Sequence, residues 1–402
     1  MGSEIIKLAE RMQQIKPSPT LAVNAKAKAM KAAGADILNF SVGEPDFDTP
    51  AHVCEAGKAA IDEGFTRYTA VPGIIELREA IVKRFAEDKG WDYEPDQVQV
   101  SCGGKHGLYN MAQALFGPGD EVLIPTPYWV SYPPIVLLAG ATPVLVPLPE
   151  ENNFDLSVEL LEQYATERTK GIILNSPSNP TGAIFSKNAL DAVGNMALKN
   201  GWAVISDDIY DTIVFDEGPV PHVLDVDPKL KEQTLILNGV SKSFAMTGWR
   251  IGYTLGPKHI IASMNKIQSQ STSNASSIAQ KAALAAVLGP QDFPIMMKDS
   301  FLPRREFILS ELLSIDNISC VTPNGAFYVF PNMSAYYGKS VGGKKINGSV
   351  EMSAYLLEES FMATVPGAAF GADEFVRFSF ASSMDNIKEG MNRLKEAISK
   401  LA

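Results

Sequence analysis

The stretch GIILNSPSNPTG (171–182) joins a short apolar run to a polar loop that contains two prolines. Its first part, residues 171–175, is nearly continuous Ile and Leu, as expected for a strand buried on both faces of a parallel sheet. Five further runs of similar character occur in the chain: 98–101, 121–125, 142–148, 203–207 and 234–238. Helical patterns lie between them, for example at 105–116. The alternation predicts βαβ units, and therefore an α/β fold with a mostly parallel sheet.

The chain changes character after about residue 290, where helical patterns are joined by strand-like runs at 325–330 and 376–381. This change predicts a second, smaller α+β domain. We therefore expect an N-terminal arm with part of the small domain at 1–44, a large domain at 45–289, and the small domain proper at 290–402.

Composition excludes several classes of protein. The net charge of -11 argues against a nucleic-acid surface, and no apolar run is long enough to span a membrane. Charged residues interrupt the N-terminal segment, so no signal-peptide core is expected there. Three widely spaced cysteines and four scattered histidines favour neither disulfides nor a metal site. A reducing cytoplasm is the simplest expectation.

Ligands gather at the carboxyl ends of parallel strands, so the residues that follow each run matter most. Those segments are GGK (103–105), TPYW (126–129), SPSNPTG (176–182), DDIY (207–210) and GVSKSF (239–244). They supply an anion-binding loop, an aromatic plate, amides, a carboxylate with a phenol, and a lysine. The loop SCGGKHG (101–107) does not match a nucleotide P-loop, because Gln99 and His106 stand where glycine and Ser or Thr are required.

This set of groups suits pyridoxal 5'-phosphate. That cofactor needs a lysine amine for a Schiff base, a carboxylate on its pyridine nitrogen and a cup for its phosphate. The lysine must have a lowered pKa, which burial and a neighbouring cation supply.

Five motifs together resemble the class I aminotransferases of fold type I, over essentially the whole chain: FSVGEPDFDTP (40–50), NSPSNPTG (175–182), SDDIY (206–210), SKSFAMTGWRIGY (241–253) and VRFSFA (376–381). The segments KPSPT (16–20), GGK and PYWVSY (127–132) are most similar to the subgroup of bacterial and plant aspartate/prephenate aminotransferases. The resemblance implies a three-layer αβα large domain that binds pyridoxal phosphate, and a homodimer with shared active sites.

By resemblance, Lys242 is the Schiff-base lysine, and its free amine moves the substrate proton. Asp207 holds the pyridine nitrogen in its protonated form. Tyr210 and Asn179 donate hydrogen bonds to the phenolate oxygen of the ring, and Trp129 stacks on the ring face while also bordering the substrate.

The resemblance assigns the phosphate to Ser241, Arg250 and the backbone of Gly103 and Gly104, at the start of the predicted helix where an anion is favoured. Tyr68 matches a tyrosine that reaches the phosphate from the partner subunit. Some relatives carry a phosphate-binding serine three residues before the lysine. Here that residue is Gly239, so this contact is expected to be missing.

For the substrate, the resemblance implies that Arg377 grips the α-carboxylate as a bidentate fork, helped by Asn179 and the backbone of Gly43. Lys105 and Thr20 match the residues that contact a second, distal carboxylate. The expected reaction transfers the amino group between L-aspartate or L-glutamate and 2-oxo acids such as oxaloacetate and 2-oxoglutarate. It proceeds in two half-reactions by way of pyridoxamine phosphate.

Several of these residues also have simpler interpretations. Asp207 and Asp208 would suit the start of a helix, and we assign only Asp207 to the site because a strand end directs it into the crevice. Asn175 is expected to stabilise the proline-rich turn. Arg377 alternates with Val376 and Phe378, which taken alone predicts a solvated strand face. Trp129 would be explained equally well as a residue of the hydrophobic core, and Tyr68 as an ordinary residue of a loop.

Alternative functions remain open from the sequence. They include a prephenate aminotransferase that forms arogenate, a broader aromatic aminotransferase, and a β-lyase or decarboxylase on the same fold. A ligand-sensing regulator would need a DNA-binding segment for which this acidic chain leaves no room. A nicotinamide-dependent dehydrogenase is disfavoured because GPGDEV (117–122) precedes its strand and lacks the third glycine.

Overall fold

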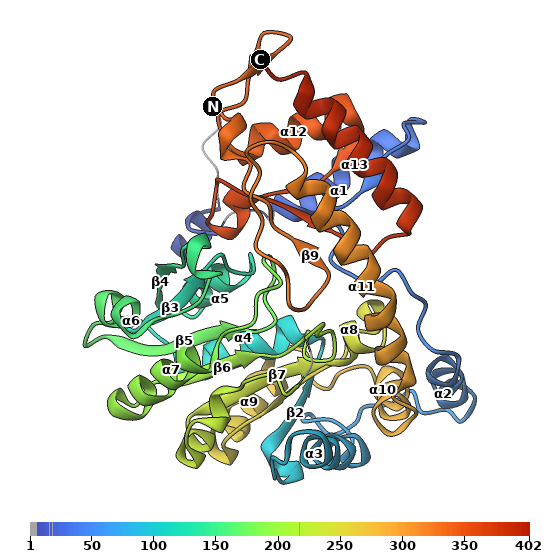
Figure 1. Ribbon diagram of the computed structural model, residues 1–402. Helices are drawn as coiled ribbons and strands as arrows, with labels where there is room; N and C mark the ends of the chain where they lie inside the picture. The colour runs from blue at the N-terminus through green and yellow to red at the C-terminus, as the bar shows by residue number, and fades with distance from the viewer. Residues whose placement is uncertain (1–5, 16, 18, 217) are drawn as a thin grey trace.

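The computed structural model describes residues 6–15, 17, 19–216 and 218–402 of the chain (Figure 1). Its centre is a seven-stranded sheet in the order β2-β8-β7-β6-β5-β3-β4. These strands are β2 (Val98–Ser101), β3 (Glu121–Thr126), β4 (Thr142–Pro147), β5 (Thr169–Asn175), β6 (Ala203–Asp207), β7 (Thr234–Gly239) and β8 (Gly252–Leu255). All neighbouring pairs from β7 to β4 are parallel, which confirms the α/β fold with a mostly parallel sheet.

Two strands differ from the sequence-based expectation. β8 was not foreseen, and it lies antiparallel between β2 and β7. β4 is the edge strand beside β3, and its side chains are largely exposed or half-buried, so it is not covered on both faces as the other runs are. An edge strand has a neighbouring strand on one side only. The apolar run of β4 is therefore buried on one face of the sheet and not on both.

Helices cover both faces of this sheet, which makes the three-layer arrangement visible in Figure 1. Alternate strand residues sort to the two faces: Ile173 and Ile205 pack with one helical layer, whereas Ile172 and Val204 pack with the other. The helices of this region are α2 (Ala51–Asp62), α3 (Ile75–Lys89), α4 (Gly104–Leu115), α5 (Tyr132–Leu138), α6 (Val158–Tyr164), α7 (Lys187–Asn200), α8 (Val240–Ser243), α9 (Lys258–Ser271) and α10 (Ser277–Leu288). The predicted helix at 105–116 corresponds to α4.

The remaining elements form a second group above the sheet in Figure 1. Its helices are α1 (Pro19–Ala32), α11 (Asp292–Leu313), α12 (Ser349–Ser360) and α13 (Met384–Ser399). Its strands are β1 (Leu38–Asn39), β9 (Tyr328–Val329), β10 (Ser340–Val341), β11 (Lys344–Lys345), β12 (Met362–Ala363), β13 (Val365–Pro366) and β14 (Val376–Ser379). β1 pairs with β12, so residues before the large sheet and residues near the C-terminus share this group.

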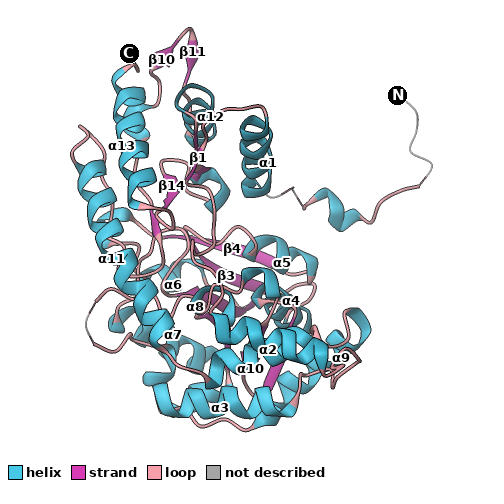
Figure 2. Cartoon of the chain, turned by 90° about the vertical axis from the view of Figure 1, so that its right-hand side faces the viewer, coloured by secondary structure: helices cyan, strands magenta, loops and turns pink. Residues whose placement is uncertain are grey.

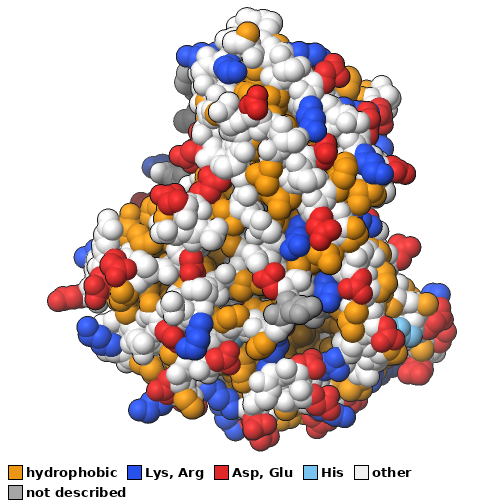
Figure 3. All heavy atoms as spheres, in the orientation of Figure 1, with side chains coloured by type: hydrophobic (Ala, Val, Ile, Leu, Met, Phe, Trp, Pro, Cys, Tyr) orange, Lys and Arg blue, Asp and Glu red, His pale blue; other side chains and the backbone are white. Residues whose placement is uncertain are grey.

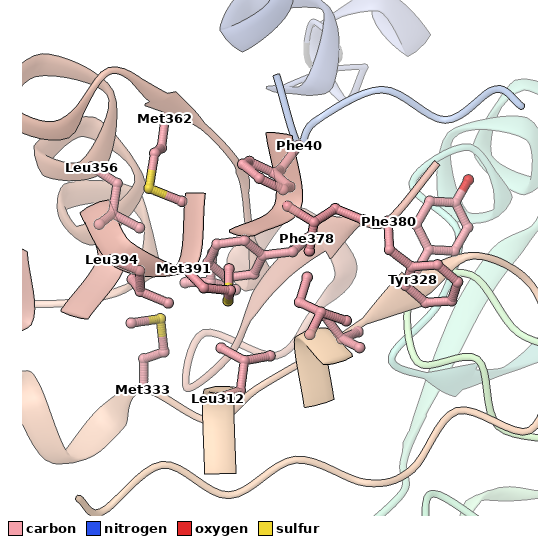
Figure 4. Packing of buried hydrophobic residues seen from close by; sticks show 14 of the residues in the cluster. Phe40, Leu312, Tyr328, Met333, Leu356, Met362, Phe378, Phe380, Met391 and Leu394 are labelled. Atoms are coloured by element: carbon pink, nitrogen blue, oxygen red, sulfur yellow. The ribbon is translucent and has the colours of Figure 1, made fainter. Parts of the chain in front are cut away.

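A separate apolar core holds this second group together (Figure 4). Phe40, Phe378 and Phe380 are at most 1 % exposed and pack with Leu356 and Met391 from the two C-terminal helices. Burying an aromatic or aliphatic side chain of this size contributes about 1.5–3 kcal/mol. Because Tyr210 and Ile213 of the sheet region join the same core, the core also fixes the second group against the ends of the large sheet.

The surface is mixed in charge, with acidic and basic side chains interspersed on the face seen in Figure 3. In the part of the chain that the structure describes, no helix combines the length and the apolar character that crossing a membrane requires. Figure 2 shows residues 6–15 extending away from the body, and residues 6–14 are exposed.

Candidate active site

A cavity of about 440 Å³ opens where β5, β6 and β7 end, between the large sheet and the second group. The strand register sets its floor, because Asn175 pairs with Asp207 and Asp207 pairs with Leu237 at the carboxyl edge. Eleven of the fourteen predicted site residues line this cavity: Gly43, Gly104, Lys105, Trp129, Asn179, Asp207, Tyr210, Ser241, Lys242, Arg250 and Arg377. They come from distant parts of the chain, so folding brings them together.

Three predicted residues lie elsewhere. Gly103 precedes α4 and lies beside the Arg250 side chain rather than in the cavity wall. Tyr68 is 90 % exposed, in the loop between α2 and α3, and does not reach the cavity of its own chain. Thr20 belongs to α1, but its side chain lies outside the described residues.

Lys242 lies in α8, three residues beyond the end of β7. Its Nζ donates a hydrogen bond to the carbonyl of Gly43. Enclosure in the cavity lowers the lysine pKa to about 8, with the positive charges of Arg377 and Arg250 acting in the same direction and Glu44 opposing them. A larger fraction of its amine is therefore neutral near pH 7 than for an exposed lysine, as a nucleophile requires.

Asp207 ends β6 with its carboxylate in the cavity, and burial raises its pKa to about 7. Its Oδ2 accepts a 2.7 Å hydrogen bond from the hydroxyl of Tyr132, and its Oδ1 accepts one of 3.3 Å from the backbone N–H of Ile209. Both bonds favour the ionised carboxylate. The sequence analysis gave no role to Tyr132. From the sequence, its position three residues after Trp129 indicates that it lies near the loop that carries Trp129. The sequence does not indicate that its side chain turns towards Asp207.

Asn175 fixes the turn that follows β5, as predicted. Its amide nitrogen donates 2.9 Å to the carbonyl of Asp207, and its Oδ1 accepts 2.8 Å from the N–H of Asn179. One amide therefore ties the end of β6 to the loop that carries Asn179. Asp208 points away from the cavity, and its Oδ2 lies 3.2 Å from Nε2 of His222, which agrees with its expected structural role.

Arg377 lies in β14 and is only 3 % exposed. Its Nη1 donates 2.8 Å to Oδ1 of Asn179, and its Nη2 donates 2.8 Å to the carbonyl of Ser41. The guanidinium lies over the rings of Tyr328 and Phe370, 4.4 and 5.1 Å from their centroids. The simple expectation of a solvated strand face is wrong here, because β14 is the middle strand of its sheet and both of its faces are covered.

The charge of Arg377 has no carboxylate partner within the described residues. Its Nε is buried and donates no hydrogen bond to any described protein atom. A buried cation with only neutral partners is costly unless an anion joins it, so this part of the cavity is prepared for a negatively charged ligand.

Tyr210 is buried, and its hydroxyl lies 2.9 Å from the hydroxyl of Tyr328. Tyr328 was not singled out from the sequence, because its strand-like run GAFYVF (325–330) suggests core packing only. In Figure 4 its hydroxyl points away from the packed rings, which leaves its ring in the core and its polar end at the cavity. Tyr328 therefore connects Tyr210 to Arg377.

A second group of hydrogen-bond donors lies at the start of α4. Arg250 donates 2.9 Å from Nη1 to the carbonyl of Thr247, and a Cβ added to Gly103 would lie 2.3 Å from its Nη2. Gly103 has φ +86°, so its backbone also favours glycine. The free N–H groups of a helix start beside a guanidinium suit a phosphate.

Lys105 stands at the rim of the cavity and is exposed. Its Nζ lies 4.9 Å from the ring centroid of Trp129. Although the residue as a whole is exposed, partial burial of its amine against the cavity wall, and then the charge of Arg250, lower its pKa. It is a second cation on the wall of the same cavity as Arg377.

These residues fit pyridoxal phosphate. Lys242 would attach it, Asp207 would meet its ring nitrogen, and the corner formed by Gly104, Ser241 and Arg250 would receive its phosphate.

No group of three or more potential metal ligands occurs among the described residues.

Comparison with known proteins agrees with this arrangement. Residues 35–394 match the family model described as aminotransferase class I and II. An aspartate aminotransferase of Geobacillus stearothermophilus is 47 % identical over 97 % of this chain and 98 % of that protein. An aspartate/prephenate aminotransferase of Cereibacter sphaeroides is 47 % identical over 96 % of this chain and 98 % of its own length.

Two solved structures have the same fold. The aspartate aminotransferase from Rhizobium meliloti superposes with a TM-score of 0.94 at 42 % identity, over 99 % of this chain and all of that one. The aspartate aminotransferase from Thermus thermophilus with maleate gives 0.91 at 39 % identity, over 98 % of this chain and all of the other. The match of the family model, the relatives and the fold over nearly the whole length shows that this chain belongs to the class I and II aminotransferases, enzymes that depend on pyridoxal phosphate.

Proposed function

We propose that this enzyme is an aspartate aminotransferase that moves the amino group between L-aspartate or L-glutamate and the corresponding 2-oxo acids. The observation that carries the proposal is the pair of cations on one cavity wall: buried Arg377, without a carboxylate partner, and Lys105 at the rim. A dicarboxylate substrate matches two separate cations better than a monocarboxylate does.

The names of the relatives support the same substrate. The relatives from Geobacillus stearothermophilus and Bacillus subtilis are named aspartate aminotransferase alone, and the relatives whose names include prephenate also name aspartate. The Thermus thermophilus structure is described with maleate, which is a dicarboxylate. Prephenate and the broader aromatic acids are therefore not favoured as the main substrates.

In the proposed reaction, pyridoxal phosphate supplies the electron sink that stabilises the substrate carbanion and carries the amino group between the two half-reactions. Arg377, held by Asn179, orients the substrate through its α-carboxylate. Lys242, with its lowered pKa, takes the proton from the Cα of the amino-acid donor, and in the second half-reaction it delivers a proton to the Cα of the amino acid that forms. Asp207 holds the ring nitrogen protonated, and Trp129 limits tilting of the ring.

We also propose that the enzyme is a homodimer in which Tyr68 completes the partner's phosphate site. The high exposure of Tyr68, and the exposed apolar residues Ile6, Leu8 and Met12 before α1, support a second copy that covers them. The domain limits 1–44, 45–289 and 290–402, the contact of Thr20 with the distal carboxylate, and a cytoplasmic location remain predictions.

Replacement of Lys242 by alanine tests the cofactor. The purified wild-type protein should show a visible or near-ultraviolet absorption band that depends on pH and arises from cofactor attached to Lys242. The Lys242→Ala variant should lose this band. Lys170→Ala is a matched control, because Lys170 is exposed at the opposite end of β5. A wild-type protein that stays colourless with added pyridoxal phosphate would contradict the proposal.

Replacement of Lys105 by alanine tests the dicarboxylate substrate. We expect kcat/KM for aspartate to fall roughly 10- to 150-fold, as for a lost hydrogen bond to a charged group of about 1.5–3 kcal/mol. The value for phenylalanine, which has one carboxylate, should change little. Equal losses for both substrates would show that Lys105 does not read the second carboxylate; Lys170→Ala again serves as the control.

The phosphate corner can be tested with two glycines. Gly103→Ala should weaken pyridoxal phosphate binding, because the new Cβ displaces the Arg250 guanidinium as well as straining the backbone. Gly119→Ala is the matched control, with φ +94° but open space around the new Cβ. Both variants should lose roughly 1–3 kcal/mol of stability from backbone strain. Only Gly103→Ala should lose cofactor affinity, measured by titration of the ligand-free protein, and equal affinities would count against the corner.

Hybrid dimers test Tyr68. Consider a hybrid dimer of one Lys242→Ala subunit and one Tyr68→Ala subunit. If Tyr68 serves the partner's site, one site of this hybrid carries both changes, and the other site keeps the native Lys242 and the native Tyr68. Random reassembly of equal amounts should then recover about one quarter of the wild-type activity, although each variant alone is weak. If Tyr68 acts within its own chain, or the protein is monomeric by light scattering, no recovery follows.

A further inference from the structure

Tyr132 lines the cavity, is almost fully buried, at 2 % exposed, and carries a polar group for which the proposed reaction has no role so far. It is the first residue of α5, and its backbone N–H donates 3.0 Å to the carbonyl of Trp129. The helix start therefore places its side chain beneath the loop that carries Trp129.

One side chain contacts both groups that are expected to hold the cofactor ring. The Tyr132 ring lies edge-on to the Trp129 ring, with centroids 5.4 Å apart and planes at 79°. Its hydroxyl donates 2.7 Å to Oδ2 of Asp207. An edge contact fixes the tilt of a ring, and a short bond to a carboxylate oxygen fixes the rotation of that carboxylate.

We propose that Tyr132 is a positioning residue that holds the Asp207 carboxylate ionised and aligned for the ring nitrogen of the cofactor, and at the same time sets the Trp129 plate. The inference rests on the proposed function, since it assigns the cofactor ring to this part of the cavity. Tyr132 itself acts through Asp207 and Trp129.

The charges around Asp207 explain why such a residue is needed. Burial alone raises the pKa of Asp207, and the neighbouring carboxylate of Asp208 raises it further. The Tyr132 hydroxyl, the N–H of Ile209 and the charge of Lys242 act in the opposite direction. Tyr210 also faces Asp207, but its hydroxyl is bonded to Tyr328.

Towards the ionised carboxylate of Asp207, the Tyr132 hydroxyl acts as the donor. Burial and the adjacent Asp207 raise the pKa of Tyr132 well above its usual value, so the phenol stays protonated throughout the working range. Loss of the hydroxyl would therefore raise the pKa of Asp207, which already lies at about 7, and more of it would be neutral at neutral pH. A neutral acid holds a protonated ring nitrogen weakly.

The experiment compares Tyr132→Phe with the wild type in the affinity of the ligand-free protein for pyridoxal phosphate between pH 6 and pH 9. Phenylalanine keeps the edge contact to Trp129 and removes only the hydroxyl. We expect a loss of roughly tenfold at neutral pH, as for a lost bond to a charged group. The loss should shrink as pH rises, because a higher pH restores the ionised carboxylate. Equal affinities at every pH would overturn the inference.

Tyr355→Phe is the matched control. Tyr355 is 6 % exposed, and its hydroxyl donates 2.9 Å to the carbonyl of Ala397, within the second group and away from the cavity. It should lose a similar amount of thermal stability without any change in cofactor affinity. If both variants lose affinity alike, the effect is a general loss of stability, and the inference is wrong.

A double-mutant cycle separates action through Asp207 from any other route, and it also applies if Tyr132→Phe is unstable. In an Asp207→Ala background, the further change Tyr132→Phe should cost no additional affinity. A further tenfold loss there would overturn the inference. A wild-type protein that binds pyridoxal phosphate but does not transaminate aspartate would refute the proposed substrate alone, whereas one that binds no pyridoxal phosphate would refute both proposals.

Discussion

The buried guanidinium of Arg377 is the interaction on which the site depends. It is held by two neutral oxygens and two aromatic rings, and these come from Asn179 after β5, from Ser41 before the large sheet, and from the second group itself. A charge in such surroundings is strongly destabilised unless its hydrogen bonds are made and an anion is at hand. The second group and the large sheet must therefore meet correctly for Arg377 to be tolerated.

The charge balance of the cavity extends this point. Its charged lining consists of the cations Lys105, Lys242, Arg250 and Arg377 and the carboxylates Glu44 and Asp207. The protein as a whole carries a net charge of -11, so the positive excess is local. Burial is the main reason that Lys242 has a lowered pKa, and the nearby positive charges of Arg377 and Arg250 favour its neutral form further. In the proposed reaction, a phosphate and two substrate carboxylates would neutralise this excess.

The sequence predicts the part of the site that follows directly from strand ends. Asp207 ends a buried strand and Lys242 follows the next one, and parallel neighbours bring both to one edge. The sequence does not predict contacts that depend on angles between elements. The side chain of Tyr132 reaches Asp207 only because α5 starts where it does. The alternating pattern around Arg377 does not indicate whether the sheet is covered on one face or on both. β8 was missed for a related reason: four residues after an irregular loop carry little periodicity.

The two cations that are predicted to bind the substrate carboxylates are held very differently. This difference has consequences for substrate choice. Arg377 is fixed by two hydrogen bonds and two rings, whereas Lys105 is exposed and rests against the ring of Trp129. A fixed guanidinium demands one position of the α-carboxylate, so the bond that reacts always points the same way. A flexible lysine loses little by moving to meet a distal carboxylate that lies one carbon nearer or farther. An aminotransferase that must accept both a four-carbon and a five-carbon dicarboxylate in turn needs this combination: rigidity at the reacting end and tolerance at the other.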